Sequence, residues 1–125
     1  EHPDKDADVF NFITEGVYYK EDGNYYITYN ESHLTGMDGT TTTLKIEPDS
    51  VTLIRSGNVS SLMVFKKGRR HTSEYSTEYG TFEVGVTAQK VSVNMDDSGG
   101  NIDVEYFIEV NNQLTSFTTL NVKVQ

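Results

Sequence analysis

The amino-acid sequence predicts an all-β domain, an antiparallel up-and-down β-barrel of about eight to ten strands. The first observation behind this prediction is composition. Of the 125 residues, 34 are the β-branched residues Val, Ile and Thr and 14 are Tyr or Phe, whereas Ala and Leu together number eight. Such side chains fit a pleated surface and lose rotamer freedom in a helix. The other two observations are short stretches of alternating polarity and frequent turn sequences between them.

Turn sequences divide the chain into segments with the length of strands. Residues 1–8 are mostly charged, so we expect a flexible N-terminal segment followed by one barrel domain over residues 9–125. Most connections have about two to five residues, which is typical of antiparallel hairpins. The expected strands cover residues 9–20, 25–34, 40–47, 50–56, 59–67, 69–77, 81–88, 90–95, 101–110 and 113–124.

Alternation is clearest in the last third of the chain. One apolar face is expected to carry Ile102, Val104, Tyr106, Ile108 and Val110, and another Leu114, Leu120, Val122 and Val124. The apolar phase changes from even to odd numbers between Ala88 and Val91, which predicts a β-bulge near Gln89 or Lys90. One buried and one wet face on each strand fits a closed barrel or a two-sheet sandwich. We favour the barrel because closure leaves no unpaired edge.

Composition also limits the partners and the compartment. The formal charge of −9 and the pI near 4.6 argue against binding to nucleic acid or to an anionic membrane surface. No apolar stretch is long enough to span a bilayer as a helix. The absence of cysteine excludes disulfides and thiolate chemistry and fits a reducing, cytoplasmic compartment. We expect a monomer or a weak homodimer.

Several polar residues share the phase of apolar neighbours, and they predict a pocket. Val51 and Leu53 place Arg55 on their own face, although the competing phase of the same strand would turn Arg55 to the surface. A guanidinium beside carboxylate, imidazole and phenol groups would read a small, partly apolar or anionic ligand inside the barrel. The candidate ligand-binding residues are Glu31, Arg55, His71, Tyr75 and Tyr29. The structural alternative is an Arg55–Glu31 ion pair near one barrel end.

No pattern in the sequence predicts catalysis, so we expect no enzyme, no catalytic residue and no cofactor. A nucleophile elbow and a phosphate-binding glycine loop are both absent. The three histidines, His2, His33 and His71, lack the spacing of a metal site, and we expect no metal. The alternative function is a structural or protein-interaction domain with a filled core and no ligand. Its interface would use outward Phe107 and Phe117.

Four ordered motifs connect the sequence to a known family. They lie at residues 25–46, 51–57, 63–65 and 75–80. Together they resemble the YwiB-like proteins of Gram-positive bacteria, a domain-of-unknown-function family with a calycin-like β-barrel, and the resemblance runs from about Val9 to Val124. It implies an antiparallel barrel and a soluble cytoplasmic protein, and it implies no activity. Lipocalins proper carry a Gly-x-Trp signature near the first strand, and this chain has no Trp.

Overall fold

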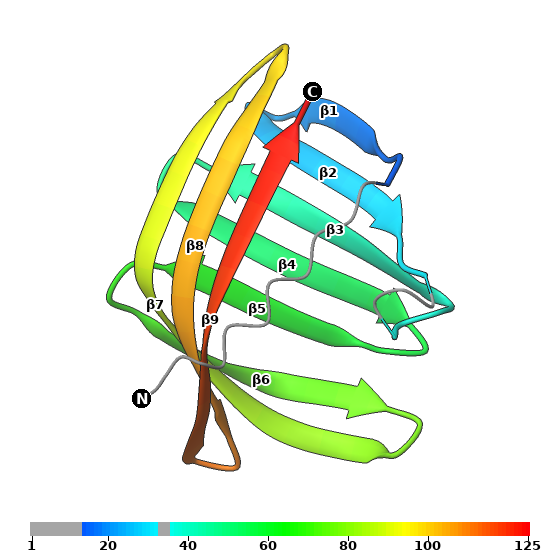
Figure 1. The fold of residues 1–125 in the computed structure, drawn as a ribbon, viewed down its shortest axis with the longest axis vertical. Helices are drawn as coiled ribbons and strands as arrows, with labels where there is room; N and C mark the ends of the chain where they lie inside the picture. Colours follow the sequence, from blue (N-terminus) through cyan, green and yellow to red (C-terminus); the bar gives the residue numbers. More distant parts are fainter. Residues whose placement is uncertain (1–13, 33–35) are drawn as a thin grey trace.

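The computed structural model describes residues 14–32 and 36–125, which form nine antiparallel strands and no helix (Figure 1). The strands are β1 (Val17–Glu21), β2 (Asn24–Asn30), β3 (Thr40–Glu47), β4 (Ser50–Gly57), β5 (Ser61–Lys66), β6 (Arg70–Thr77), β7 (Gly80–Asp96), β8 (Gly99–Val110) and β9 (Gln113–Val124). Neighbours in sequence are neighbours in space within each sheet. The all-β class, the up-and-down order and the expected number of strands are therefore confirmed.

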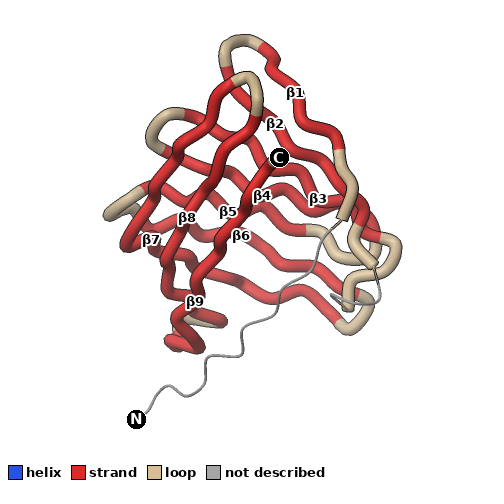
Figure 2. Tube along the Cα trace, turned by 45° about the horizontal axis from the view of Figure 1, so that its top comes forward, coloured by secondary structure: helices blue, strands red, loops and turns tan. Residues whose placement is uncertain are grey.

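The strands are divided between two sheets that face each other across the core (Figure 2). One sheet contains β1 to β5 and the other β6 to β9. Between the described strands of the two sheets, backbone pairing is limited to isolated bridges, Ser60 with Ser76 and Lys67 with Ala88. Among the described strands β1 and β9 are not paired, so the expected complete closure is not found. Closure requires pairing along both sides of every strand, and the five-residue β1 and the bridged contact of β5 with β6 do not supply it.

The predicted β-bulge is confirmed in β7. This strand has 17 residues and pairs with β6 along its first half and with β8 over most of its length. The register shifts between Ala88 and Lys90, which leaves Gln89 as the extra residue. The extra residue changes the phase, so Val86 before it and Val91 after it both pack against the same core.

Apolar side chains fill the space between the sheets. Phe65 and Tyr106 meet there from opposite sheets, with ring centroids 4.5 Å apart. Their contact is part of one continuous core, so removal of this surface from water is the main stabilising term. The buried apolar residues of this core are Ile27, Leu44, Ile46, Val51, Leu53, Met63, Phe65, Val84, Val86, Ala88, Ile102, Val104 and Tyr106.

A second register shift makes the expectation for Leu114 wrong. Ile108 pairs with Ser116, but the next residue, Glu109, pairs with Leu114, so Thr115 is left without a paired residue on β8. Leu114 consequently leaves the face of Leu120, and its residue is 67% exposed. It joins the outer surface of this sheet. Phe107 and Phe117 also face this outer surface, as predicted. Their rings pack on each other with centroids 4.9 Å apart.

Two tyrosines connect the sheets at the end where the β1–β2 hairpin meets the β7–β8 turn. The Tyr18 hydroxyl donates a hydrogen bond to the Asp96 carbonyl at 2.6 Å, and the Tyr25 hydroxyl donates one to the Asp97 carboxylate at 2.6 Å. The two rings stack with centroids 5.4 Å apart. Lys20 lies 5.5 Å from the Tyr25 ring centroid and 3.9 Å from the Asp97 carboxylate. Side chains therefore bridge the two sheets where the backbone ladder does not.

Candidate functional site

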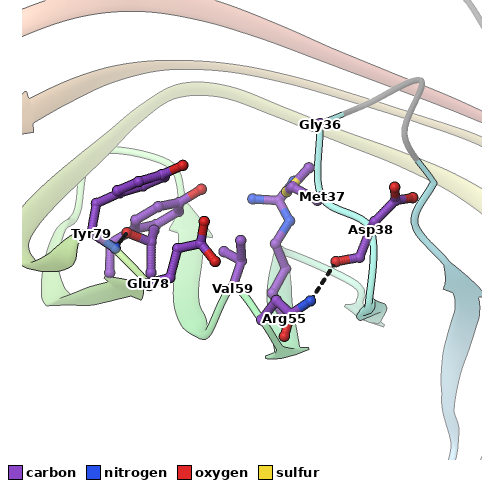
Figure 3. A pocket seen from close by; sticks show the side chains of 10 residues that line it. Gly36, Met37, Asp38, Arg55, Val59, Glu78 and Tyr79 are labelled. Atoms are coloured by element: carbon purple, nitrogen blue, oxygen red, sulfur yellow. Dashed lines mark hydrogen bonds between the residues drawn. The ribbon is translucent and has the colours of Figure 1, made fainter.

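A cavity of about 610 Å³ lies at one end of the barrel, where the β2–β3, β4–β5 and β6–β7 loops meet (Figure 3). In an up-and-down barrel every second connection lies at the same end, which brings these three loops together. The cavity is lined by Gly36, Met37, Asp38, Arg55, Asn58, Val59, Tyr75, Thr77, Glu78 and Tyr79. Its size is typical of sites for small molecules.

The strand geometry of β4 directs Arg55 into this cavity. Val51 and Leu53 are buried, and Arg55 follows them on the same face, as the alternation predicted. The Arg55 side chain is 18% exposed. In the ladder Arg55 pairs with Thr42 of β3 on one side and with Ser61 of β5 on the other. A cation thus lies between two buried hydroxyl residues.

Glu31 is buried behind Arg55 and faces it. The distance from Arg55 Nε to Glu31 Oε2 is 3.9 Å, and the Glu31 side chain is only 1% exposed. The Thr42 hydroxyl donates a hydrogen bond to Glu31 Oε2, and the Glu31 backbone N–H donates one to the Thr40 carbonyl at 2.8 Å. These bonds hold the carboxylate in place, and they are what makes a buried charge tolerable. The structural alternative of an Arg55–Glu31 ion pair near a barrel end is therefore present beside the cavity.

Two tyrosines border this charged pair. Burial raises the pKa of Tyr29 from its usual value near 10 to about 12, and the nearby Glu31 carboxylate adds to the shift while Arg55 opposes it. Burial also raises the pKa of Tyr106, which Arg55 again opposes. Both phenols therefore stay neutral at physiological pH and act as hydrogen-bonding groups at the edge of the core.

Two buried polar atoms near the cavity have no hydrogen-bond partner. They are Nε of Arg55 and the hydroxyl oxygen of Ser61, which belong to directly paired residues of β4 and β5. Most buried polar groups in proteins are satisfied, so a pair of unsatisfied groups beside a cavity calls for a water or a ligand. A third such atom among the described residues, Nδ1 of His71, lies outside the cavity lining, so it is the cavity beside Arg55 that distinguishes the open end.

Close backbone contacts build the rim of the cavity. Gly57 has φ of 125°, and a side chain there would overlap the Gly39 carbonyl oxygen of the neighbouring loop. The Asn58 side-chain amide donates a hydrogen bond to the Asp38 carbonyl at 2.9 Å, and the Asn58 backbone N–H donates one to the Gly39 carbonyl at 3.2 Å. The β2–β3 and β4–β5 loops are therefore fixed to each other at the entrance of the cavity.

The structure brings together some of the candidate residues and separates others. Arg55 and Tyr75 line the cavity, whereas Glu31 and Tyr29 lie behind Arg55 and do not line it. His71 lies four residues before Tyr75 on β6 and is also absent from the lining. Its Nδ1 is buried without a hydrogen-bond partner. His2 and His33 lie outside the described residues, and the described part contains no group of three potential metal ligands.

The loop residues of the cavity were missed from the sequence. Met37, Asn58, Thr77, Glu78 and Tyr79 all lie in connections or at strand ends, so they have no apolar phase to reveal them. The signal that could have found them is the order of the loops, because alternate connections of a meander converge at one end.

Comparisons with known proteins agree with this architecture. Residues 1–122 match the family described as a domain of unknown function, DUF1934. The chain belongs to this family. A DUF1934 relative of this chain is the uncharacterised beta-barrel protein YwiB of Bacillus subtilis (strain 168), which is 26% identical over 110 residues, 88% of this chain and 76% of YwiB.

The crystal structure of ywiB protein from Bacillus subtilis has the same fold. It superposes on this chain with a TM-score of 0.75 at 24% sequence identity, covering 91% of this chain and 78% of the other. This structural similarity confirms the fold and assigns no activity to the chain. In the part of the DUF1934 chain that the structure describes, no helix has the length and apolar character needed to cross a bilayer.

Proposed function

We propose that this DUF1934 chain is a binding protein whose open barrel end holds a small, partly apolar ligand with a carboxylate or a similar anionic group. The observation that supports the proposal most directly is Arg55 in the cavity lining, with a side chain that is 18% exposed and Nε 3.9 Å from the Glu31 carboxylate behind it. A guanidinium presents two parallel N–H donors to a carboxylate, which gives both affinity and orientation.

The other lining residues suit the remainder of such a ligand. Met37, Val59 and the rings of Tyr75 and Tyr79 offer apolar and aromatic surface. Thr77 and Asn58 offer hydrogen-bonding groups at the rim. Small-molecule sites commonly combine a mostly apolar wall with a few polar groups that fix orientation. The interior beyond Arg55 is filled by the core, so we place the ligand at the mouth rather than along the barrel axis.

The experiment is a titration with a simple probe, para-toluate, followed by amide NMR chemical shifts. We expect shifts confined to the loops around Val59 and Glu78, and we expect the neutral isostere para-toluamide to bind about tenfold more weakly because it lacks the charge that Arg55 reads. The variant Arg55→Lys keeps the charge and loses the planar fork, so it should bind para-toluate several-fold more weakly.

Arg70→Lys is the matched control for that variant, because Arg70 lies on the outer face of β6 and pairs with Glu109. It should leave para-toluate binding unchanged. Shifts spread over the outer sheet faces, or equal binding of the acid and the amide, would contradict the proposal. Native mass spectrometry of protein taken gently from its source would identify a co-purifying ligand directly.

A second candidate function is a protein-interaction domain that pairs with another copy of itself. The outer face of the second sheet carries the Phe107–Phe117 pair, exposed Leu114 and a hollow of about 420 Å³ whose lining includes Phe107, Leu114 and Arg70. Exposed aromatic surface beside a hollow is typical of contact sites. A concentration-dependent rise in mass by light scattering, abolished by Phe117→Ser, would support it.

We also propose a cytoplasmic location, no nucleic-acid partner and at most a weak homodimer. The cysteine-free composition and the acidic pI support the first two statements. The third statement rests on the outer face of the second sheet, where Leu114 and Phe117 are the exposed large apolar residues of the described strands β8 and β9.

A further inference from the structure

We propose that the ligand at the open end is dipolar, with its acidic group at Arg55 and an amino group at the rim beside Glu78. This inference rests on the proposed function and specifies the chemical class of the ligand. It follows from the order of charges in the cavity, where a cation lies at the inner end and carboxylates lie outside it.

The charge balance of the cavity disfavours a simple anion. Its lining contains one cation, Arg55, and two acids, Asp38 and Glu78. Glu31 contacts Arg55 from behind and already offsets part of its charge. The whole chain has a formal charge of −9. An anion would therefore meet one partly neutralised cation inside a negative field, whereas a ligand with a balancing positive group would meet a partner for each charge.

The rim acids are available for such a group. In the described part of the chain neither Asp38 nor Glu78 forms an ion pair with a Lys or Arg side chain. Glu78 acts instead on its neighbour, because its hydrogen bond with the Tyr79 hydroxyl raises the pKa of that phenol. Figure 3 shows Arg55 between the Glu78–Tyr79 turn on one side and Asp38 on the other. A cation at this turn would contact both the Glu78 carboxylate and the exposed Tyr79 ring.

The apolar part of the lining selects the ligand further. Val59 and Tyr75 contribute apolar surface to the lining shared by Arg55 and Glu78. The ligand therefore needs an apolar or aromatic spacer between its carboxylate and its amino group. Amino acids with a distant amine and short peptides belong to this class, whereas fatty acids and phosphate esters do not.

The test compares three probes that share one ring: para-(aminomethyl)benzoate with both charges, para-toluate with the acid alone and para-methylbenzylamine with the amine alone. Binding to the full chain is measured by calorimetry and by amide NMR shifts. We expect para-(aminomethyl)benzoate to bind about tenfold more tightly than para-toluate, and Glu78→Gln to reduce this ratio to about twofold or less.

Glu74→Gln is the matched control, because Glu74 is exposed on β6 and does not line the cavity. It should leave the ratio unchanged. Equal or tighter binding of para-toluate than of para-(aminomethyl)benzoate would overturn the dipolar ligand while leaving the proposed function in place. Failure of both carboxylate probes to shift the cavity loops at millimolar concentration would overturn the proposed function itself.

Discussion

The two ends of the barrel use polar side chains in opposite ways. At the end of the β7–β8 turn, Tyr18 and Tyr25 extend from the first sheet and donate hydrogen bonds to Asp96 and Asp97 of the second. At the other end, Arg55 faces a cavity of about 610 Å³ and its Nε has no hydrogen-bond partner. The first end joins β1 and β2 of one sheet to the β7–β8 turn of the other by side-chain hydrogen bonds, and the second leaves a space between three loops.

The comparison shows that a polar residue in an apolar phase has two possible roles. A phenol at the barrel end is long enough to reach a partner on the opposite sheet, so its hydroxyl stabilises the fold. A guanidinium held at 3.9 Å from a single carboxylate keeps several donors free of that partner. The end joined by the tyrosine hydrogen bonds is therefore structural, and the end where Arg55 lines a cavity is the better candidate for binding.

The largest expected effect comes from breaking the charged pair at the open end. Arg55→Met leaves the Glu31 carboxylate buried without its countercharge, and we expect a loss of about 3 kcal/mol in the free energy of unfolding by urea titration. Because Glu31→Gln removes the stranded charge, the double variant should recover much of this loss. Arg70→Met is the control. Its 2.7 Å pair with Glu109 is shorter but exposed, and the expected loss is under about 1 kcal/mol. Equal losses at both sites would contradict this assignment.

A matched pair of glycine substitutions gives the next effect. Gly57→Ala at the open end combines a φ of 125° with overlap of the Gly39 carbonyl oxygen, so we expect a loss above about 2 kcal/mol. Gly23→Ala in the β1–β2 hairpin has a φ of 82° but no atom within 4 Å of the added carbon, and we expect about 1 kcal/mol. Urea unfolding of both variants measures the difference. A larger loss for Gly23→Ala would show that the rim loops are not fixed as described.

The smallest effect concerns the tyrosine contacts and appears at alkaline pH. The hydrogen bond to Asp97 raises the pKa of Tyr25 to about 12, and burial raises that of Tyr29 to about 12. The folded state therefore holds its phenolic protons more tightly than the unfolded chain. Their contribution is complete below pH 10 and is lost as the pH rises through 12. Tyr25→Phe and Tyr29→Phe should each make this decline of the urea midpoint shallower, and unchanged slopes in both would contradict the shifts.

Much of the fold could be predicted from local pattern. Alternation placed Arg55 on the face of Val51 and Leu53, and the change of phase located the bulge at Gln89. Both inferences succeeded because a strand has a fixed period of two, so each residue determines the face of its neighbours. Leu114 was misplaced for the same reason. Thr115 is an extra residue between Leu114 and Ser116, and the polar residues Ser116 and Thr118 on the inner face give no apolar signal of the change of phase.

The candidate site could be predicted only in part. Tyr75 and Arg55 were predicted because they lie on strands, where alternation indicates the face of each residue. Asn58, Glu78 and Tyr79 lie in connections, which have no such periodicity. His71 shares the face of Tyr75 but lies further along β6, outside the cavity lining. Two residues on the same face of a strand point in the same direction, but they can lie at different positions along the barrel axis.

By itself the sequence determined the all-β class, the order of the strands and the position of the β-bulge, because these depend on composition and on a local period. It left Arg55 between an inward and an outward phase, and the structure has the inward one. Only the tertiary structure decided that the ladder stays open between β1 and β9, that Glu31 lies 3.9 Å behind Arg55, and that three loops enclose a cavity. Those features depend on how strands far apart in the chain are spaced and curved, and alternation along one strand carries no record of that spacing.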